Sequence, residues 1–233
     1  MDYAQLLNTI KTDFSQVDFE DIKPSRLQEH KAAIEVVLDK PMPKEFEDFY
    51  SFCDGLQRST YSKYNKDIAG YELLLPLEEV FDNFKIHTAT LTREMLEDGT
   101  VYENEPFFEN IWYDYYIDEP QTNIDTEEGR IYFEFIRRQK LLCFIVGTTF
   151  NFTIDFFDKE KPYRIYLQNS EEPVLYPLNI SLEKFYLILL QIGFTGCWYA
   201  AFMKEEDKKA INIELNTDEI SNEFQTFDFA LLN

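Results

Sequence analysis

The chain has 233 residues, of which 45% are hydrophobic and 17% are aromatic, so it can bury a core of its own and the composition excludes a disordered chain. The formal net charge is −22 at pH 7, from 22 basic and 44 acidic residues, which disfavours direct binding to nucleic acid. It favours a basic protein partner, or simply high solubility. The three cysteines, Cys53, Cys143 and Cys197, form no CxxC pair and are expected to be buried thiols, with no disulfide framework and no zinc site.

The N-terminal part of the chain is predicted to be helical. Apolar residues recur at helical spacing over residues 3–14 and again over about 25–38. A short aromatic-rich helix follows from Pro43, and Gly55 is expected to end it by taking a left-handed conformation. The first residues contain no basic region before an apolar core, so no signal peptide is predicted and a cytoplasmic protein is expected.

Strands are predicted from the middle of the chain onward. Residues 57–70 are polar and are predicted to form a loop, and residues 71–75 a short strand that Pro76 ends. Four closely spaced runs are rich in β-branched and aromatic residues, at 131–136, 141–146, 152–157 and 164–167. Their short polar connections predict antiparallel hairpins.

Residues 185–203 carry no charge and are long enough to span a bilayer. Ser181 is, however, a good helix N-cap, and Gly193 and Gly196 suit a helix stop and a turn. We therefore predict a buried helix over 182–192 followed by a second short helix, and no interaction with a membrane.

The order of helices, strand meander and helices predicts an α+β fold, with an antiparallel β-meander sheet flanked by N-terminal and C-terminal helices. We expect one domain over residues 1–233, with an acidic-aromatic insertion at about 85–128 and a C-terminal extension from about 193. Phe224, Phe227 and Phe229 indicate that this extension packs back onto the core.

Residues 94–128, here called the acidic-aromatic segment, contain twelve Asp and Glu residues and no Lys or Arg. The segment is either a solvated loop whose aromatic side chains enter the core, or a partner-binding surface, on which Tyr and Trp act as anchors and carboxylates steer a basic partner. For the second interpretation the candidate anchors are Trp112, Tyr113, Tyr115 and Tyr116. The candidate electrostatic contacts are Glu103, Glu105, Glu109, Asp114, Asp118 and Glu119.

Nothing in the sequence indicates catalysis. The two histidines, His30 and His87, occur in no metal-binding or nucleophile-activating spacing, and no phosphate-binding glycine motif is present. Carboxylates are so abundant that a pair of them carries no information. We therefore expect a protein that is not an enzyme, with no catalytic residues, no metal and no cofactor.

The order of motifs resembles the SUKH superfamily, named partly for a yeast regulator of cell-wall synthesis. The resemblance rests on residues 38–43 (LDKPMP), Phe46, Phe49, Tyr50, the Asp54-Gly55 step, residues 74–80 (LLPLEEV), the strands from 131 to 167 and the helix from 181 to 192. The sequence departs from the family pattern at Met42, where Leu is usual, at Asp54, where Asn is usual, and in its long acidic insertion.

This resemblance implies a SUKH-like domain and a binding role. The bacterial members are largely immunity proteins of polymorphic-toxin systems, often directed against nucleases, and they carry no known catalytic residues. We therefore expect an immunity protein that neutralises a cognate toxin, with a basic nuclease domain as its partner. The alternative is a non-enzymatic regulatory or scaffold protein of the same superfamily. The oligomeric state is left open.

Overall fold

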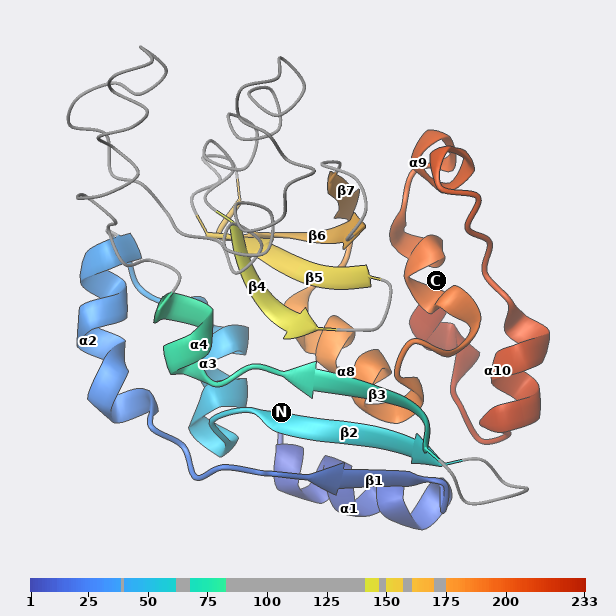
Figure 1. The fold of residues 1–233 in the computed structure, drawn as a ribbon, viewed down its shortest axis with the longest axis horizontal. Helices are drawn as coiled ribbons and strands as arrows, with labels where there is room; N and C mark the ends of the chain where they lie inside the picture. The colour runs from blue at the N-terminus through green and yellow to red at the C-terminus, as the bar shows by residue number, and fades with distance from the viewer. Residues whose placement is uncertain (39, 62–67, 83–140, 147–149, 157–160, 170–174) are drawn as a thin grey trace, which may run out of the picture.

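The computed structural model describes residues 1–38, 40–61, 68–82, 141–146, 150–156, 161–169 and 175–233. Three predictions lie outside these residues: the strand at 131–136, the insertion at about 85–128, and the surroundings of His87. The structure is drawn along the chain in Figure 1.

One antiparallel sheet runs through the described part of the protein, and its strands follow one another in space in the order in which they occur in the sequence (Figure 1). This arrangement confirms the predicted α+β fold with a β-meander. The strands are β1 (Val17–Glu20), β2 (Leu56–Tyr61), β3 (Ile68–Leu74), β4 (Leu141–Val146), β5 (Phe150–Asp155), β6 (Arg164–Asn169) and β7 (Leu175–Leu178).

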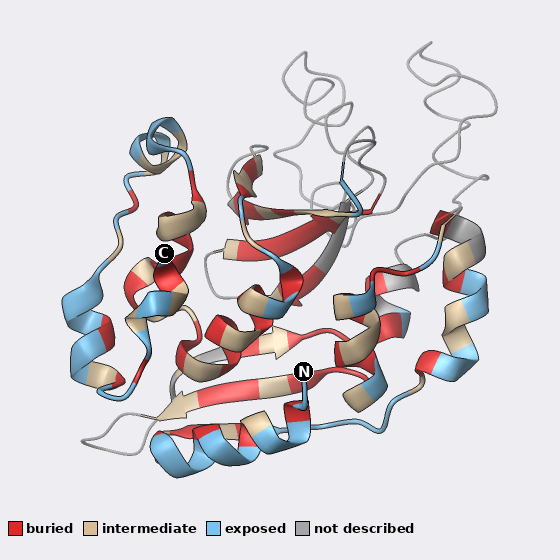
Figure 2. Cartoon of the chain, turned by 180° about the vertical axis from the view of Figure 1, so that it is seen from behind, coloured by how far each residue is buried: buried red, intermediate tan, exposed pale blue. Residues whose placement is uncertain are grey.

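Helices α1 (Tyr3–Asp13), α3 (Lys44–Phe52) and α8 (Leu182–Ile192) lie together on one face of this sheet, which is the near face in Figure 2. Aromatic side chains join them. The rings of Phe49 and Tyr186 stack with their centroids 4.4 Å apart, and Tyr3 meets Phe49 edge-on at 5.3 Å. The aromatic face of α3 is therefore covered by α1 and α8.

Strand β5 shows how the sheet divides into two faces. Phe152 and Ile154 are fully buried, and the ring of Phe152 meets that of Phe185 on α8 at 4.8 Å. The alternate residues Asn151 and Thr153 are also buried but lie on the opposite face, because successive side chains of a strand point in opposite directions. The helix side of the sheet is thus apolar at this point, and the other side is polar.

The junction after α3 contacts the segment that precedes α2 (Leu27–Leu38), and it also contacts the start of α4 (Leu77–Asp82). Gly55 has a φ of 86°, the left-handed conformation predicted for it. Its neighbour Asp54 is buried, and its Oδ1 accepts a hydrogen bond of 2.8 Å from the backbone N–H of Leu77, at the start of α4. One carboxylate therefore satisfies the first N–H of a helix more than twenty residues away in sequence.

Helix α8 and the segment after it also agree with the prediction. The Ser181 hydroxyl caps the helix by accepting from the N–H of Lys184, and the helix ends at Gly193. A 3₁₀ helix, η1 (Thr195–Phe202), follows. No helix in the described ranges combines the length and the apolar character needed to cross a membrane.

The C-terminal extension consists of α9 (Glu205–Ala210), α10 (Thr217–Glu223) and η2 (Phe229–Leu232) after η1. Phe224 and Phe227 are buried, and the ring of Phe224 meets that of Phe14 edge-on with centroids 5.2 Å apart. The extension therefore packs back onto the core, as the sequence predicts.

The prediction for residues 57–70 is wrong, because β2 and the start of β3 occupy most of this range. The sequence pattern also does not predict strands β1 and β7. Strand β2 carries polar side chains on both faces, and Arg58 and Ser59 are fully buried there. Both side chains are buried because they have partners elsewhere in the fold. A search for alternating hydrophobic residues along the sequence cannot detect such partners. In β7, Pro177 argues against a strand when only the sequence is considered, although proline is tolerated on an edge strand.

Candidate functional site

The ten residues predicted for partner binding all lie outside the described residues, so their placement stays a prediction. They are Glu103, Glu105, Glu109, Trp112, Tyr113, Asp114, Tyr115, Tyr116, Asp118 and Glu119. Both ends of the sequence that contains them join the described core. Leu77 and Val80 of α4 before it, and Phe144 and Ile145 of β4 after it, have no exposed surface.

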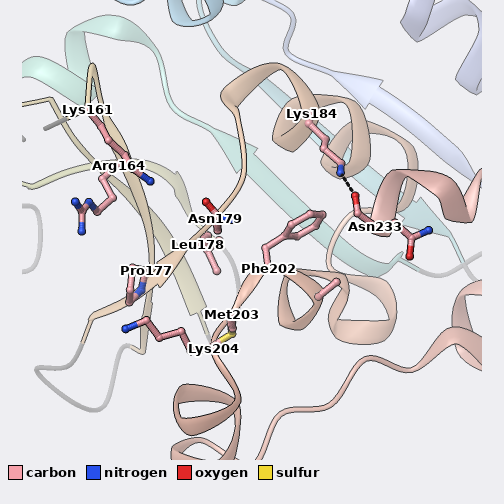
Figure 3. A pocket seen from close by; sticks show the side chains of 11 residues that line it. Lys161, Arg164, Pro177, Leu178, Asn179, Lys184, Phe202, Met203, Lys204 and Asn233 are labelled. Carbon is pink, nitrogen blue, oxygen red and sulfur yellow. Dashed lines mark hydrogen bonds between the residues drawn. The ribbon is translucent and has the colours of Figure 1, made fainter.

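A second candidate site is visible in the described residues. A surface pocket of about 610 Å³ opens between strands β6 and β7, the first turn of α8, and the end of η1 (Figure 3). It is lined by Lys161, Arg164, Pro177, Leu178, Asn179, Lys184, Ala201, Phe202, Met203, Lys204 and Asn233. We call it the basic pocket.

Four of these side chains are cationic, and none of the described lining residues is Asp or Glu. This composition is unusual in a chain of net charge −22. Lys161 and Arg164 come from one side of the pocket and Lys184 from the helix on the other, with Asn179 and Phe202 between them (Figure 3).

The fold positions Lys184 on the helix side of the pocket. Its backbone lies in the first turn of α8, where the Ser181 cap fixes the helix start. Its Nζ donates a hydrogen bond of 2.8 Å to the backbone carbonyl oxygen of Asn233 and lies 4.9 Å from the centroid of the Phe202 ring. The ammonium group is therefore held against an aromatic face, where a cation is favoured.

Arg164 and Lys204 differ in how firmly they are held. Arg164 is the first residue of β6 and pairs in register with Asp155 of β5. Lys204 precedes α9, and its side chain is 69% exposed, with Nζ 3.6 Å from a carboxylate oxygen of Glu206. Such an exposed ion pair contributes little to stability, so this ammonium can exchange Glu206 for another anion.

The rest of the pocket surface is largely apolar, from Pro177, Leu178, Ala201, Phe202 and Met203. A shallower hollow of about 270 Å³ shares Lys161, Arg164, Leu178 and Asn179 with it and extends toward Tyr163. The Tyr163 hydroxyl accepts a hydrogen bond of 2.9 Å from the N–H of Leu182, and burial raises its pKa. This tyrosine therefore stays neutral and helps to hold the start of α8.

The strongly perturbed titratable groups belong to the core rather than to the basic pocket. Burial raises the pKa of the Cys53 thiol to about 12, and it raises the pKa of Tyr3, Tyr186 and Tyr199 above the usual tyrosine range. Cys53 is buried as predicted, whereas Cys197 is only partly buried. Within the described ranges, no three His, Cys, Asp or Glu side chains are placed to hold a metal ion.

Sequence reasoning missed the basic pocket because its cations are scattered. Lys161 and Arg164 lie in one segment, Lys184 and Lys204 lie in two others, and the four residues share no motif or period. Only the pairing of β6 with β7 and the packing of η1 bring them together. Their number is also small beside the 44 acidic residues, so no local composition signal marks them.

The chain matches no family model, no curated protein and no solved structure. Membership of the SUKH superfamily therefore stays a prediction that rests on the motifs quoted above.

Proposed function

We propose that this protein is an immunity protein that acts in the cytoplasm, where it binds and neutralises a basic nuclease toxin without catalysing a reaction. The observation that carries the proposal is the acidic-aromatic segment, twelve carboxylates without a single Lys or Arg among residues 94–128. The motif resemblance to the SUKH superfamily points in the same direction.

The physical argument is electrostatic complementarity. A nuclease holds the phosphate backbone with cationic side chains, so a surface of carboxylates can occupy the same groove and exclude the substrate. Attraction between opposite charges also accelerates association and fixes the register of the complex. Aromatic side chains among the carboxylates, with Trp112 first among them, would supply the desolvated contact area that charges alone do not provide.

The described residues on either side of the insertion support this role, because they are buried and joined by hydrogen bonds. The insertion lies in the sequence between α4 and β4. The segment that leads from β3 into α4 contacts β4, because the N–H of Leu75 donates a hydrogen bond of 3.0 Å to the carbonyl oxygen of Phe144. The Tyr50 hydroxyl donates to the carbonyl of Leu75 at 2.8 Å, which ties the same point to α3. A partner-binding segment at this place in the sequence would be attached to buried residues of the core.

The direct test is co-purification with the toxin domain encoded beside this protein, followed by a nuclease assay. We expect a stable complex at low salt and loss of nuclease activity at equimolar protein. A variant carrying Asp118→Lys and Glu119→Lys should lose both properties.

The matched control is a variant carrying Asp13→Lys and Glu214→Lys. It changes the net charge by the same amount at two exposed sites in α1 and before α10. It should retain both properties. Failure of the folded wild-type protein to bind the neighbouring toxin domain would overturn the proposal.

A further inference from the structure

We propose that the buried ion pair of Arg58 on β2 and Glu72 on β3 is a positioning device for the C-terminal extension. It sets the direction in which the chain leaves α8, and it thereby selects one arrangement of residues 190–233 rather than adding stability. This inference goes beyond the proposed function, because it concerns a part of the protein that the acidic-aromatic segment does not include.

The first step concerns the energetics of the ion pair. The side chain of Arg58 has no exposed surface, and that of Glu72 is 5% exposed. The cost of taking two charges out of water can equal the gain from their attraction, so a buried ion pair is often no more stabilising than apolar side chains of similar volume. Buried polar groups do select one geometry, because other geometries leave a donor or an acceptor unpaired. The partners of the pair therefore indicate what it selects.

The ion pair holds the backbone where α8 ends. Arg58 donates hydrogen bonds from Nε to the carbonyl oxygen of Leu190 at 2.9 Å and from Nη2 to that of Gln191 at 2.8 Å. Oε1 of Glu72 accepts a hydrogen bond of 3.1 Å from the N–H of Phe194. Side chains of two strands thus bind three backbone groups of one turn, which apolar side chains in their place could not do.

The turn held in this way leads directly into the C-terminal extension. Trp198 on η1 is fully buried, and its Nε1 donates a hydrogen bond of 2.6 Å to the carbonyl oxygen of Gly193, inside the turn. The carbonyl oxygen of Gly196 accepts a hydrogen bond of 2.9 Å from the N–H of Asn216, which caps α10. A different chain direction at Gly193 would therefore break contacts of both η1 and α10.

The residues that follow α10 return to the ion pair. Phe224 is fully buried, and the centroid of its ring lies 6.0 Å from the guanidinium carbon of Arg58. The neighbouring Glu223 accepts a hydrogen bond of 2.6 Å at its carbonyl oxygen from Nε2 of Gln16. The extension thus contacts the pair both where it begins and where it packs back, so the geometry of the pair and the placement of the extension depend on each other.

A variant without the two charges, carrying Arg58→Met and Glu72→Met, tests the proposal by hydrogen exchange followed by NMR. The indole N–H of Trp198 and the backbone N–H of Phe224 report on the extension, and the N–H groups of β5, which pairs on both sides, report on the sheet. Relative to β5, we expect the two extension groups to exchange at least about tenfold faster than in the wild type. An unchanged ratio would overturn the proposal.

Urea denaturation of the same variant separates positioning from stabilisation. It should unfold at a higher urea concentration than the single variant Arg58→Met, because the single change leaves the Glu72 charge buried without its partner. A lower midpoint for the double variant would overturn the proposal. The matched control carries Lys44→Met and Asp48→Met, which remove an exposed ion pair on α3, and its exchange ratio should equal that of the wild type. An equally raised ratio in this control would also overturn the proposal.

A measurement on the wild-type protein does not depend on the folding of any variant. The N–H of Phe194 and the indole N–H of Trp198 should exchange no faster than the N–H groups of β5, because the ion pair holds the turn to the sheet. Exchange of these two groups at least about tenfold faster than β5 would show that the turn opens while the sheet stays folded, and it would overturn the proposal.

Discussion

Arg58 on β2 and Glu72 on β3 form a salt bridge of 2.9 Å that is buried between the sheet and α8. The Arg58 guanidinium also donates to the carbonyl oxygens of Leu190 and Gln191, at 2.9 and 2.8 Å, near the end of α8. The second carboxylate oxygen of Glu72 accepts from the N–H of Phe194. The pair thus joins two strands and satisfies backbone groups that the end of a helix leaves without partners.

Removing one member of this pair should be strongly destabilising. Burial lowers the pKa of Arg58, and Glu72 opposes that shift, so loss of either side chain leaves a buried charge without its partner. We expect Arg58→Met to lower the free energy of unfolding by about 3–5 kcal/mol in urea denaturation. The control Lys44→Met breaks the exposed pair with Asp48 and should barely move the urea midpoint. A small effect of Arg58→Met would contradict the role assigned to the pair.

Gly193 should tolerate no side chain, because its surroundings include the same ion pair. Its φ is 57°, and a Cβ there would overlap the Glu72 carboxylate and lie 2.5 Å from a guanidinium nitrogen of Arg58. We expect Gly193→Ala to cost about 2–4 kcal/mol in urea denaturation. Gly70→Ala is the control, since no atom lies within 4 Å of its Cβ position, and it should be close to neutral. Equal urea midpoints for the two variants would refute the packing described around Gly193.

Asp54 should be replaceable by an amide but not by alanine. Its Oδ1 accepts the hydrogen bond from the N–H of Leu77, and an Asn side chain offers the same acceptor. We expect Asp54→Ala to cost about 1–2 kcal/mol, because the first N–H of α4 would be buried without a partner. Asp54→Asn should cost clearly less in the same thermal or urea measurement. If both variants lose equal stability, the carboxylate charge matters rather than the acceptor.

Alkaline pH should unfold the protein through its buried acids. In the folded state burial keeps Tyr3, Tyr186 and Tyr199 protonated above pH 10, and Cys53 has a pKa of about 12. The unfolded chain releases these protons near the ordinary values of 10.0 for tyrosine and 9.0 for cysteine, so the folded state binds more protons. Stability should therefore fall as pH rises above these values.

Absorbance at the tyrosinate wavelength, followed together with circular dichroism, checks this prediction. The part of the tyrosinate signal that comes from the buried rings should rise only as the protein unfolds. Full tyrosinate formation in a chain that keeps its native circular dichroism spectrum would contradict the burial of these side chains.

Helix α8 can be predicted from the sequence, whereas strand β2 cannot. Residues 182–192 have a serine cap, a regular apolar pattern and a glycine at the end, so the sequence predicts this helix with its bounds. Strand β2 has no apolar alternation, because Arg58 lies where an apolar residue would be expected and depends on Glu72, fourteen residues away. Pairing of that kind appears only once the strands are in register.

The two candidate sites divide in the same way. The acidic-aromatic segment is contiguous, so its composition alone identifies it in the sequence. Its residues lie outside those that the structure describes. The basic pocket is assembled from Lys161, Arg164, Lys184 and Lys204, which are spread over more than forty residues. A site built from single residues of separate elements leaves no local pattern in a sequence.

The measurement that tests the central claim most directly is the association rate with the neighbouring toxin domain as a function of salt. Charge steering predicts a rate that falls steeply with added salt, and a fall of at least about tenfold at low salt when Asp118 and Glu119 are replaced by Lys. The equally charged variant at Asp13 and Glu214 should associate nearly as fast as the wild type. An association rate that does not change with salt concentration, or that falls equally in both variants, would contradict a binding surface centred on the acidic-aromatic segment.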